Sequence, residues 1–450
     1  MTTGSDDETG TGRESPDGTA EPGRSAAWRW YVCVLLMLAT VVNYMDRVTV
    51  NTLAKPIQVD FGLNNEQYGN LELGFGLAFA AGSLLFGWMV DRIGVYWLYP
   101  AVLVGWSVMG FLTGLSRSYS ELLTLRILLG LFEAGHFPCG LKTIQLLLAP
   151  RDRALGNSLL QSGTALGAAL APQAIRLLLE PGVSGWRRPF LVIGAGGTAW
   201  VVLWLLSMRP KDLLPGPIRK GEGGDTPGAP GSSGDGRSFR SVVLSARFAS
   251  LAVMVVCINL NWHVLRVWLP KFLQEARGYD QDSMLNFTTF YYVAADIGAI
   301  GAGALTGWLA RRGLSVFSSR MWVFGGCCLL TTLTTAVAVL PKGPLLLGAL
   351  FVVAFGGLGS FAAYYSLTQD LSRKHQGKVS GTLATITWLV SASIHPLIGK
   401  HLDRTRSYDI IIGVVGWMPL IALAAVLLLW KPGRGGLDEE GQPIPIEGHH

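Results

Sequence analysis

The most constraining feature of this sequence is a series of twelve long apolar runs. The hydrocarbon core of a bilayer is about 30 Å thick, so a helix needs roughly 20 mostly apolar residues to cross it. Runs of that length lie at residues 28–52, 69–90, 96–116, 120–146, 153–179, 188–208, 246–271, 285–310, 318–340, 344–368, 378–400 and 410–430. The sequence therefore predicts an all-α membrane protein with twelve transmembrane helices in a lipid bilayer.

The composition argues against a soluble domain and against a nucleic-acid partner. Asp, Glu, Lys and Arg make up 15% of the 450 residues, whereas an ordinary soluble domain contains about 25%. The chain has 57 Gly and 22 Pro, which membrane helices accept because neighbouring helices satisfy the freed backbone groups. The net charge is +6, but most basic residues fall in short loops, where they set membrane orientation.

No motif for catalysis or for a bound cofactor is present in the sequence. The five cysteines lie inside apolar runs without metal-ligand spacing, as expected of small buried side chains. The sequence has no phosphate-binding loop, no His-Glu-x-x-His and no Gly-x-Ser-x-Gly. We therefore expect no enzyme activity, no cofactor and no metal.

Polar segments divide the apolar runs into two sets of six. An even number of spans places both termini on one side, and loops on that side carry more Lys and Arg, which identifies it as cytoplasmic. We expect a monomer in the cell inner (plasma) membrane. Its parts are a disordered cytoplasmic tail at 1–26, six-helix bundles at 27–208 and 246–431, a basic Gly/Pro/Ser-rich cytoplasmic linker at 209–245, and a cytoplasmic C-terminal tail at 432–450.

The two sets of runs also resemble each other. Residues 87–94 end the second run with Gly-Trp-Met-Val-Asp-Arg-Ile-Gly, and residues 307–313 end the eighth with Gly-Trp-Leu-Ala-Arg-Arg-Gly. The fifth and eleventh runs share a Gly followed by a Pro about sixteen residues later. Chance similarity of two Gly-rich segments is the alternative. Two related halves can rock about a central site, which is the basis of alternating access.

Several segments resemble known transporters. Gly87, Asp91, Arg92 and Gly94 match the Gly-x-x-x-Asp-Arg-x-Gly loop of the major facilitator superfamily. Residues 43–47, 126–138, 151–158 and 185–190 are similar to the anion:cation symporter family, which includes hexuronate, galactonate and glucarate transporters. The resemblance spans nearly all of residues 28–430.

This resemblance implies a fold, an activity and roles for particular residues. The fold is two pseudo-symmetric six-helix bundles, and the activity is proton-coupled import of a small organic anion. A sugar acid such as a hexuronate, aldonate or aldarate is the implied substrate. The family pattern gives proton transfer to Asp46 and Glu133, anion binding to Arg47 and Arg126, and gating to the loop at residues 87–94.

The residues themselves support a charged site inside the membrane. A charge at the bilayer centre costs about 2.5–3.5 kcal/mol on insertion scales, so Asp46, Arg47, Arg126 and Glu133 should face a cavity or a partner. Arg126 and Glu133 are two helical turns apart and share one face, whereas Asp46 and Arg47 point about 100° apart. The alternative is that these residues form structural ion pairs that lock the helices together.

The four charges sum to zero, so an entering carboxylate adds an unbalanced negative charge that protonation of a carboxyl group relieves. We expect Arg47 to clamp the substrate carboxylate, Glu133 to take the coupling proton, and Asp46 to be a second proton site. Arg126 is expected to pair with an acid or to assist the anion. An anion antiporter and a ligand sensor that does not transport are alternatives.

Other polar residues in the runs are weaker candidates. Tyr44, Gln161, Tyr365 and Trp388 are expected to contact substrate, with ordinary helix packing as the alternative for each. His136 is expected to be a hydrogen-bonded core histidine. Two charged residues of the second half, Arg266 and Asp296, are explained by snorkelling to the membrane surface and by an interhelical hydrogen bond.

Overall fold

The fold is a bundle of long helices. The computed structural model describes residues 25–148, 150–213, 238–371 and 376–430, and every regular element within those ranges is helical. The predicted tails fall almost wholly outside the described residues, as does the central part of the predicted linker. The described ends of that linker contain a short 3₁₀ turn, η1 (Pro210–Leu213), and a short helix, α9 (Phe239–Val243).

The first half of the chain contains eight α-helices, several of which are pieces of one membrane crossing. Asn64 begins the longest early helix with a capping box, in which its side chain accepts from the Gln67 backbone and the Gln67 side chain accepts from the Asn64 backbone. The bounds are α1 (Ala26–Thr52), α2 (Ala54–Phe61), α3 (Asn65–Ile93), α4 (Val95–Thr113), α5 (Tyr119–Glu133), α6 (His136–Leu147), α7 (Pro150–Leu178) and α8 (Arg187–Ser207).

The second half repeats this pattern after α9. Its crossings are again partly divided, because short breaks separate α12 from α13, α14 from α15 and α17 from α18. The bounds are α10 (Ala246–Lys271), a π-helical turn η2 (Phe272–Ala276), α11 (Gln281–Arg311), α12 (Val316–Thr331), α13 (Thr334–Val339), α14 (Pro344–Gly359), α15 (Phe361–Leu371), α16 (Gln376–Thr405), α17 (Asp409–Val415) and α18 (Met418–Leu429).

Eleven helices in the described residues are long and apolar enough to cross a membrane. The predicted crossing at 153–179 is not among these eleven helices. The corresponding helix α7 is long enough, with 29 residues, but it is not apolar enough. Its hydropathy is low because small residues replace large apolar ones where it packs. At Gly163 and Gly167 an added Cβ would lie 2.4 and 2.5 Å from the backbone oxygens of Met37 and Val41 in α1. Small residues of this kind let membrane helices approach closely.

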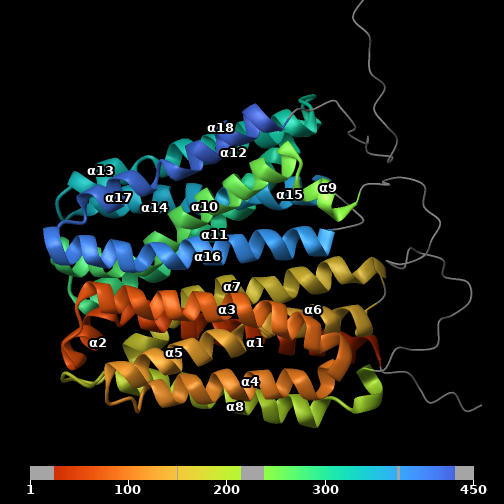
Figure 1. Cartoon of the computed structure of the whole chain (residues 1–450), viewed down its shortest axis with the longest axis horizontal. Coiled ribbons are helices and arrows are strands. Elements are labelled where there is room, and N and C mark those ends of the chain that lie inside the picture. The colour runs from red at the N-terminus through yellow and green to blue at the C-terminus, as the bar shows by residue number, and fades with distance from the viewer. Residues whose placement is uncertain (1–24, 149, 214–237, 372–375, 431–450) are drawn as a thin grey trace, which may run out of the picture.

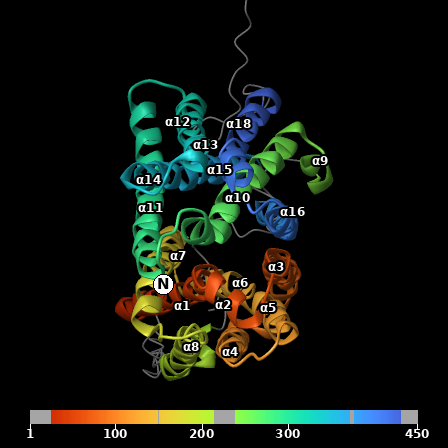
Figure 2. The same ribbon diagram turned by 90° about the vertical axis from the view of Figure 1, so that its left-hand side faces the viewer.

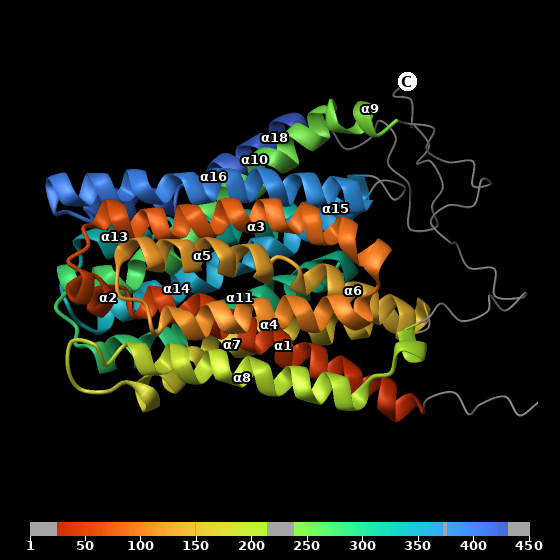
Figure 3. The same cartoon turned by 60° about the horizontal axis from the view of Figure 1, so that its bottom comes forward.

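The helices form two groups that meet mainly along four helices. Figure 2 shows α1–α8 on one side and α10–α18 on the other. Across the boundary α3 packs along α16, and α7 packs along α11. These pairs join the second crossing to the eleventh and the fifth to the eighth, so the two boundary contacts are related by the similarity of the halves. Figure 3 shows α3 and α16 side by side over most of their length.

The halves are joined by hydrogen bonds at one end of the bundle, where α2, α13 and α17 lie (Figure 1); we call it the distal end. There the Asp403 carboxylate of α16 accepts from the backbone N–H groups of Asn65 and Glu66, both at 2.9 Å, and so caps α3. An added Cβ at Gly69 would lie 2.4 Å from the carbonyl oxygen of His395. The bundle is therefore closed at its distal end.

The close approach at Gly69 leads to a test of this packing. Gly69→Ala should destabilise the protein by about 1–3 kcal/mol, because the new methyl group overlaps backbone that cannot move aside easily. Gly303→Ala is the matched control, since Gly303 lies on the exposed face of α11 with nothing within 4 Å of its added Cβ. The thermal unfolding midpoint of the purified protein measures the effect. Equal midpoints for the two variants would contradict the described contact.

Candidate functional site

The site is built on an ion pair between α1 and α5. The Nε of Arg47 donates to Oε2 of Glu133 at 2.6 Å, and the side chains are 6% and 0% exposed. Both side chains are buried in the first half, where Arg47 lies in the last third of α1 and Glu133 is the last residue of α5. The sequence predicted that these two residues lie at one site, and the structure brings them into direct contact.

Aromatic rings surround the Arg47 guanidinium. Its carbon lies 5.1 Å from the ring centre of Tyr44 and 4.6 Å from that of Phe79, within the range of cation–π attraction. Trp388 of α16 lies 5.9 Å away and packs on Phe79 with ring centres 4.6 Å apart. Tyr44 and Trp388, two predicted substrate contacts, thus lie at the charged site, and Trp388 reaches it from the second half of the chain.

A second charged group lies beside the first. The Nη2 of Arg126 donates to Oε1 of Glu72 at 2.9 Å, with side chains only 1% and 2% exposed. The other oxygen of Glu72 accepts from Nη2 of Arg266, in α10 of the second half, at 3.4 Å. The expectation that Arg126 pairs with an acid is met, but the acid is Glu72, which no sequence argument had singled out.

The sequence did not lead us to Glu72, and it led to a wrong position for Arg266. Glu72 is an acidic residue inside the apolar run 69–90. A charged residue inside a membrane-spanning run is the signal that could have identified it as a site residue. Arg266 was expected to snorkel to the membrane surface, which is wrong. Its side chain is 9% exposed and contacts Glu72 and, at 3.2 Å, Nδ1 of His263. Glu72, on another helix, keeps the Arg266 side chain in the interior of the protein. The sequence of α10 alone does not reveal this partner.

Several polar atoms of this cluster are buried without a hydrogen-bond partner in the described part of the chain. They are Nη2 of Arg47, Nε and Nη1 of Arg126, Nε of Arg266, Oε1 of Glu133, both carboxylate oxygens of Asp46 and both amide atoms of Asn43. An unpaired buried polar group costs about 1–3 kcal/mol. Such a concentration of unused donors and acceptors at one place is suited to a polar, negatively charged ligand.

Asp46 faces a different helix from Arg47, as expected for consecutive residues. Its side chain is directed at α4, where an added Cβ on Gly110 would lie 3.4 Å from Oδ1 of Asp46. Asp46 is 2% exposed, and no donor in the described residues reaches its carboxylate. A carboxyl group in such surroundings is the kind of group that can hold a proton in the membrane interior.

Two predicted substrate contacts, Tyr365 and Gln161, do not contact the charged residues, and His136 lies in the core. Tyr365 is 59% exposed and packs on Tyr364 with ring centres 5.3 Å apart, and Gln161 is exposed. The structure brings neither of them into contact with the charged residues. His136 is a hydrogen-bonded core histidine as predicted, since its ring nitrogens lie 2.8 Å from Thr40 Oγ1 and 2.9 Å from the Tyr99 hydroxyl.

Asp296 does not meet its expectation. It is half-buried in α11, and its side chain makes none of the hydrogen bonds found in the described ranges, so the predicted interhelical bond is absent there.

The loop motif forms its charged contact within the first half. Gly94, between α3 and α4, has φ 83°, a left-handed conformation that favours glycine. Asp91 accepts from Nζ of Lys142 in α6 at 2.8 Å, and both side chains are partly exposed. Arg92 lies over the ring of Trp88, 3.8 Å from its centre. No atom lies within 4 Å of a Cβ added at Gly87, so the space around this residue of α3 is open.

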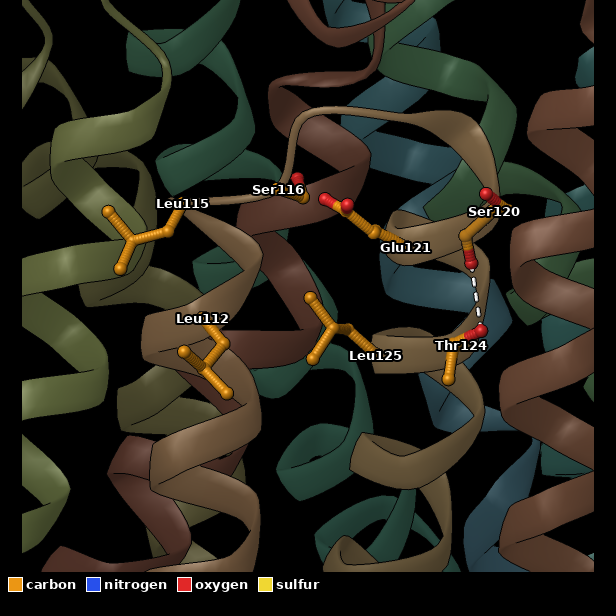
Figure 4. A pocket seen from close by; sticks show the side chains of 7 residues that line it. All are labelled: Leu112, Leu115, Ser116, Ser120, Glu121, Thr124 and Leu125. Atoms are coloured by element: carbon orange, nitrogen blue, oxygen red, sulfur yellow. Dashed lines mark hydrogen bonds between the residues drawn. The ribbon is translucent and has the colours of Figure 1, made fainter.

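Hollows on the outer surface are separate from the charged cluster. Figure 4 shows one of about 410 Å³ between α4 and α5, lined mainly by leucines and by Ser116, Ser120, Glu121 and Thr124. Another of about 370 Å³ is wholly apolar and is lined by residues of α11, α12 and α14. Neither contains Arg47, Arg126 or Glu133, and apolar hollows of this kind on a membrane protein suit lipid chains. The charged cluster is therefore the candidate functional site.

Comparisons with known proteins agree with this arrangement. The family model described as Major Facilitator Superfamily matches residues 36–396. The chain is 25% identical to a probable sulfoacetate transporter of Cupriavidus necator, covering 85% of this chain and 89% of that protein. It is also 25% identical to a D-galactonate transporter of Escherichia coli, covering 94% and 99%. A bacterial homologue of the lysosomal transporter Spinster, solved in an inward-facing state, has the same fold, with TM-score 0.70, 18% identity and coverage of 90% and 96%.

The contacts of Glu72 predict a large effect of its removal. Glu72→Ala should destabilise the protein by about 3–5 kcal/mol, because it leaves two buried arginines without their shared carboxylate. Glu180→Ala is the control, since Glu180 and its partner Arg188 are both 53% exposed and such pairs contribute about 0–1 kcal/mol. The thermal unfolding midpoint again gives the comparison. A Glu72→Ala variant as stable as the control would show that the described ion pairs are not formed.

Proposed function

We propose that this chain, which belongs to the Major Facilitator Superfamily, is a secondary transporter that imports a small organic anion together with protons. The proposal rests on the charged cluster and on relatives that are named as transporters of sulfoacetate and D-galactonate. A sugar acid such as a hexuronate, aldonate or aldarate is the proposed substrate. The protein acts as a monomer in the inner (plasma) membrane with both termini in the cytoplasm. Members of this family are transporters, and the chain is not an enzyme.

The observation that carries the proposal is the Arg47–Glu133 pair. Arg47 uses one N–H on Glu133 and keeps Nη2 unpartnered, and Glu133 keeps Oε1 unpartnered. A substrate carboxylate competes with Glu133 for the Arg47 guanidinium, because both are planar acceptors of the same kind. Once displaced, the Glu133 carboxylate is a buried charge without its cation, and a proton neutralises it at less cost than keeping the charge.

Anion and proton then favour each other's binding at this pair. The anion promotes protonation of Glu133, and protonation of Glu133 frees Arg47 for the anion. This mutual preference is reciprocal by thermodynamic linkage, and it is the physical basis of symport. Asp46, buried without a donor, is the second proton site in the proposal. Arg126 assists the anion from beside Phe75, whose ring centre lies 4.5 Å from the Arg126 guanidinium carbon.

Alternating access requires the contacts between the halves to open and close. Asp403 holds the N-terminus of α3 at the distal end. In the proposed orientation the distal end faces outward, so the structure corresponds to a state that is closed to the outside. Opening outward breaks the Asp403 cap and separates α3 from α16. In the proposal the loop at residues 87–94 acts as a gate on the cytoplasmic side, through its Asp91–Lys142 contact.

Replacing the coupling carboxyl separates anion movement from proton coupling. Glu133→Gln should keep counterflow of labelled anion in liposomes, because the neutral amide mimics the protonated acid. It should abolish accumulation driven by a pH gradient, since no proton is exchanged at that position. Glu121→Gln is the control, because Glu121 is exposed and its carboxylate accepts from the backbone N–H of Arg117, away from the charged cluster. Accumulation retained in Glu133→Gln would remove Glu133 from the proposed role.

The unmodified protein separates the proposed function from its alternatives. In liposomes an acidic exterior should drive uptake of galactonate above its equilibrium level, because the free energy released by proton entry drives the coupled entry of the anion. Dissipating the pH gradient with a protonophore should return the internal concentration to equilibrium. Counterflow without gradient-driven accumulation would indicate an anion exchanger, and binding without counterflow would indicate a ligand sensor.

A further inference from the structure

The positive charge of the site is concentrated at Arg126 and Arg266. Arg47 and Glu133 form a neutral pair, but Glu72 is shared by two arginines, so Arg126, Glu72 and Arg266 together carry one net positive charge. This triad is buried, with side chains 1%, 2% and 9% exposed. An uncompensated charge in the membrane interior is costly. When Asp46, the proposed second proton site, holds a proton, one further negative charge would balance the triad.

The two arginines also hold the donors that such a charge needs. Glu72 occupies only the Nη2 atoms, and Nε and Nη1 of Arg126 and Nε of Arg266 are buried without a partner in the described residues. Guanidinium groups have donors only and remain charged at all ordinary pH values. The contact between Arg266 and Nδ1 of His263 requires the imidazole nitrogen to accept, so His263 orients Arg266 without competing for an acceptor.

We propose that Arg126 and Arg266 form a second anion subsite, and that the transported molecule is therefore a small dianion. One acidic group lies at Arg47, where it displaces Glu133, and the other lies between Arg126 and Arg266. This inference rests on the proposed transport function and names its substrate class. Glu72 is a positioning residue in this account, since its carboxylate holds the two guanidinium groups together against their mutual repulsion.

The spacing of the two subsites limits the length of the molecule. The guanidinium carbons of Arg47 and Arg126 lie 5.7 and 4.5 Å from the centre of the same Phe75 ring, so they are no more than about 10 Å apart. Hydrogen bonds of about 2.8 Å at each end take up part of that distance. The two arginines are therefore close enough for the acidic groups of one small molecule to reach both of them.

The second subsite also involves both halves of the protein. Arg126 is on α5 and Arg266 on α10, and His263 packs against Trp388 of α16 with ring centres 4.9 Å apart. An acidic group held by Arg126 and Arg266 touches both bundles at once. A dianion thus contacts the first half through Arg47 and joins it to the second half through Arg266, which a monoanion bound at Arg47 alone does not.

Binding of matched acids to the purified full-length protein tests the proposal. Calorimetry gives the affinities for galactarate against galactonate and for tartrate against erythronate, each pair having one chain length and differing in the second acidic group. The wild type should bind the diacid of at least one pair about tenfold or more tightly than its monoacid, as expected for a charged hydrogen-bonded contact.

Variants of Arg266 distinguish recognition from structural support. Arg266→Gln should lose the diacid preference while changing monoacid affinity by less than about threefold, and Arg266→Lys should retain part of the preference through its charge. Arg404→Gln, at an exposed position near the end of α16, should leave both affinities unchanged. Equal weakening of both acids in Arg266→Gln would show a structural role only and overturn the proposal, as would a preference that survives it.

The failure of this inference can be told apart from failure of the proposed function. A wild type that binds monoacids and diacids equally, and still accumulates galactonate in response to a pH gradient, overturns the dianion proposal and leaves symport intact. A wild type that binds and transports none of the four acids overturns both.

Discussion

The structure depends on the need to compensate charges that lie in the membrane interior. Three arginines and three acidic residues, with side chains at most 9% exposed, converge from α1, α3, α5 and α10, and each arginine is paired with a carboxylate of Glu133 or Glu72. Removing one partner of such a buried pair is strongly unfavourable, so the pairs fix which helices are neighbours. The same pairs leave N–H groups of every arginine unused, and this gives the interior its capacity for an anion.

In the proposed mechanism, Glu133 marks the place that a substrate carboxylate takes. Glu133 pairs with Arg47 within the first half, and in the proposal its displacement couples the anion to a proton. Glu72 lies between arginines of opposite halves, so occupation of that region changes the contact between the bundles. The proposal thus links binding and movement through one set of charges, while the Asp403 cap and the close approach at Gly69 hold the distal end closed in this state.

The sequence was a good guide to the helices, because crossing a bilayer requires a length of apolar chain that can be counted directly. The capping residues and breaks also follow local rules. It was a poorer guide to pairing: a helical period tells which residues share a face but not which helix that face meets. Glu72 and Arg266 lie on different halves, and only the packing of α16 against both α3 and α10 explains how Arg266 comes to meet Glu72. The low hydropathy of α7 likewise reflects its contact with α1, which its own residues do not reveal.

The central claim is that an anion and a proton bind together at a buried arginine–carboxylate pair. The most direct test measures the proton uptake that accompanies anion binding, by calorimetry of the purified protein with the same acid in two buffers of different ionisation enthalpy. The account predicts uptake of about one proton for each anion bound at neutral pH, as linkage requires. Binding heats that are the same in both buffers, and thus no proton uptake, would contradict it.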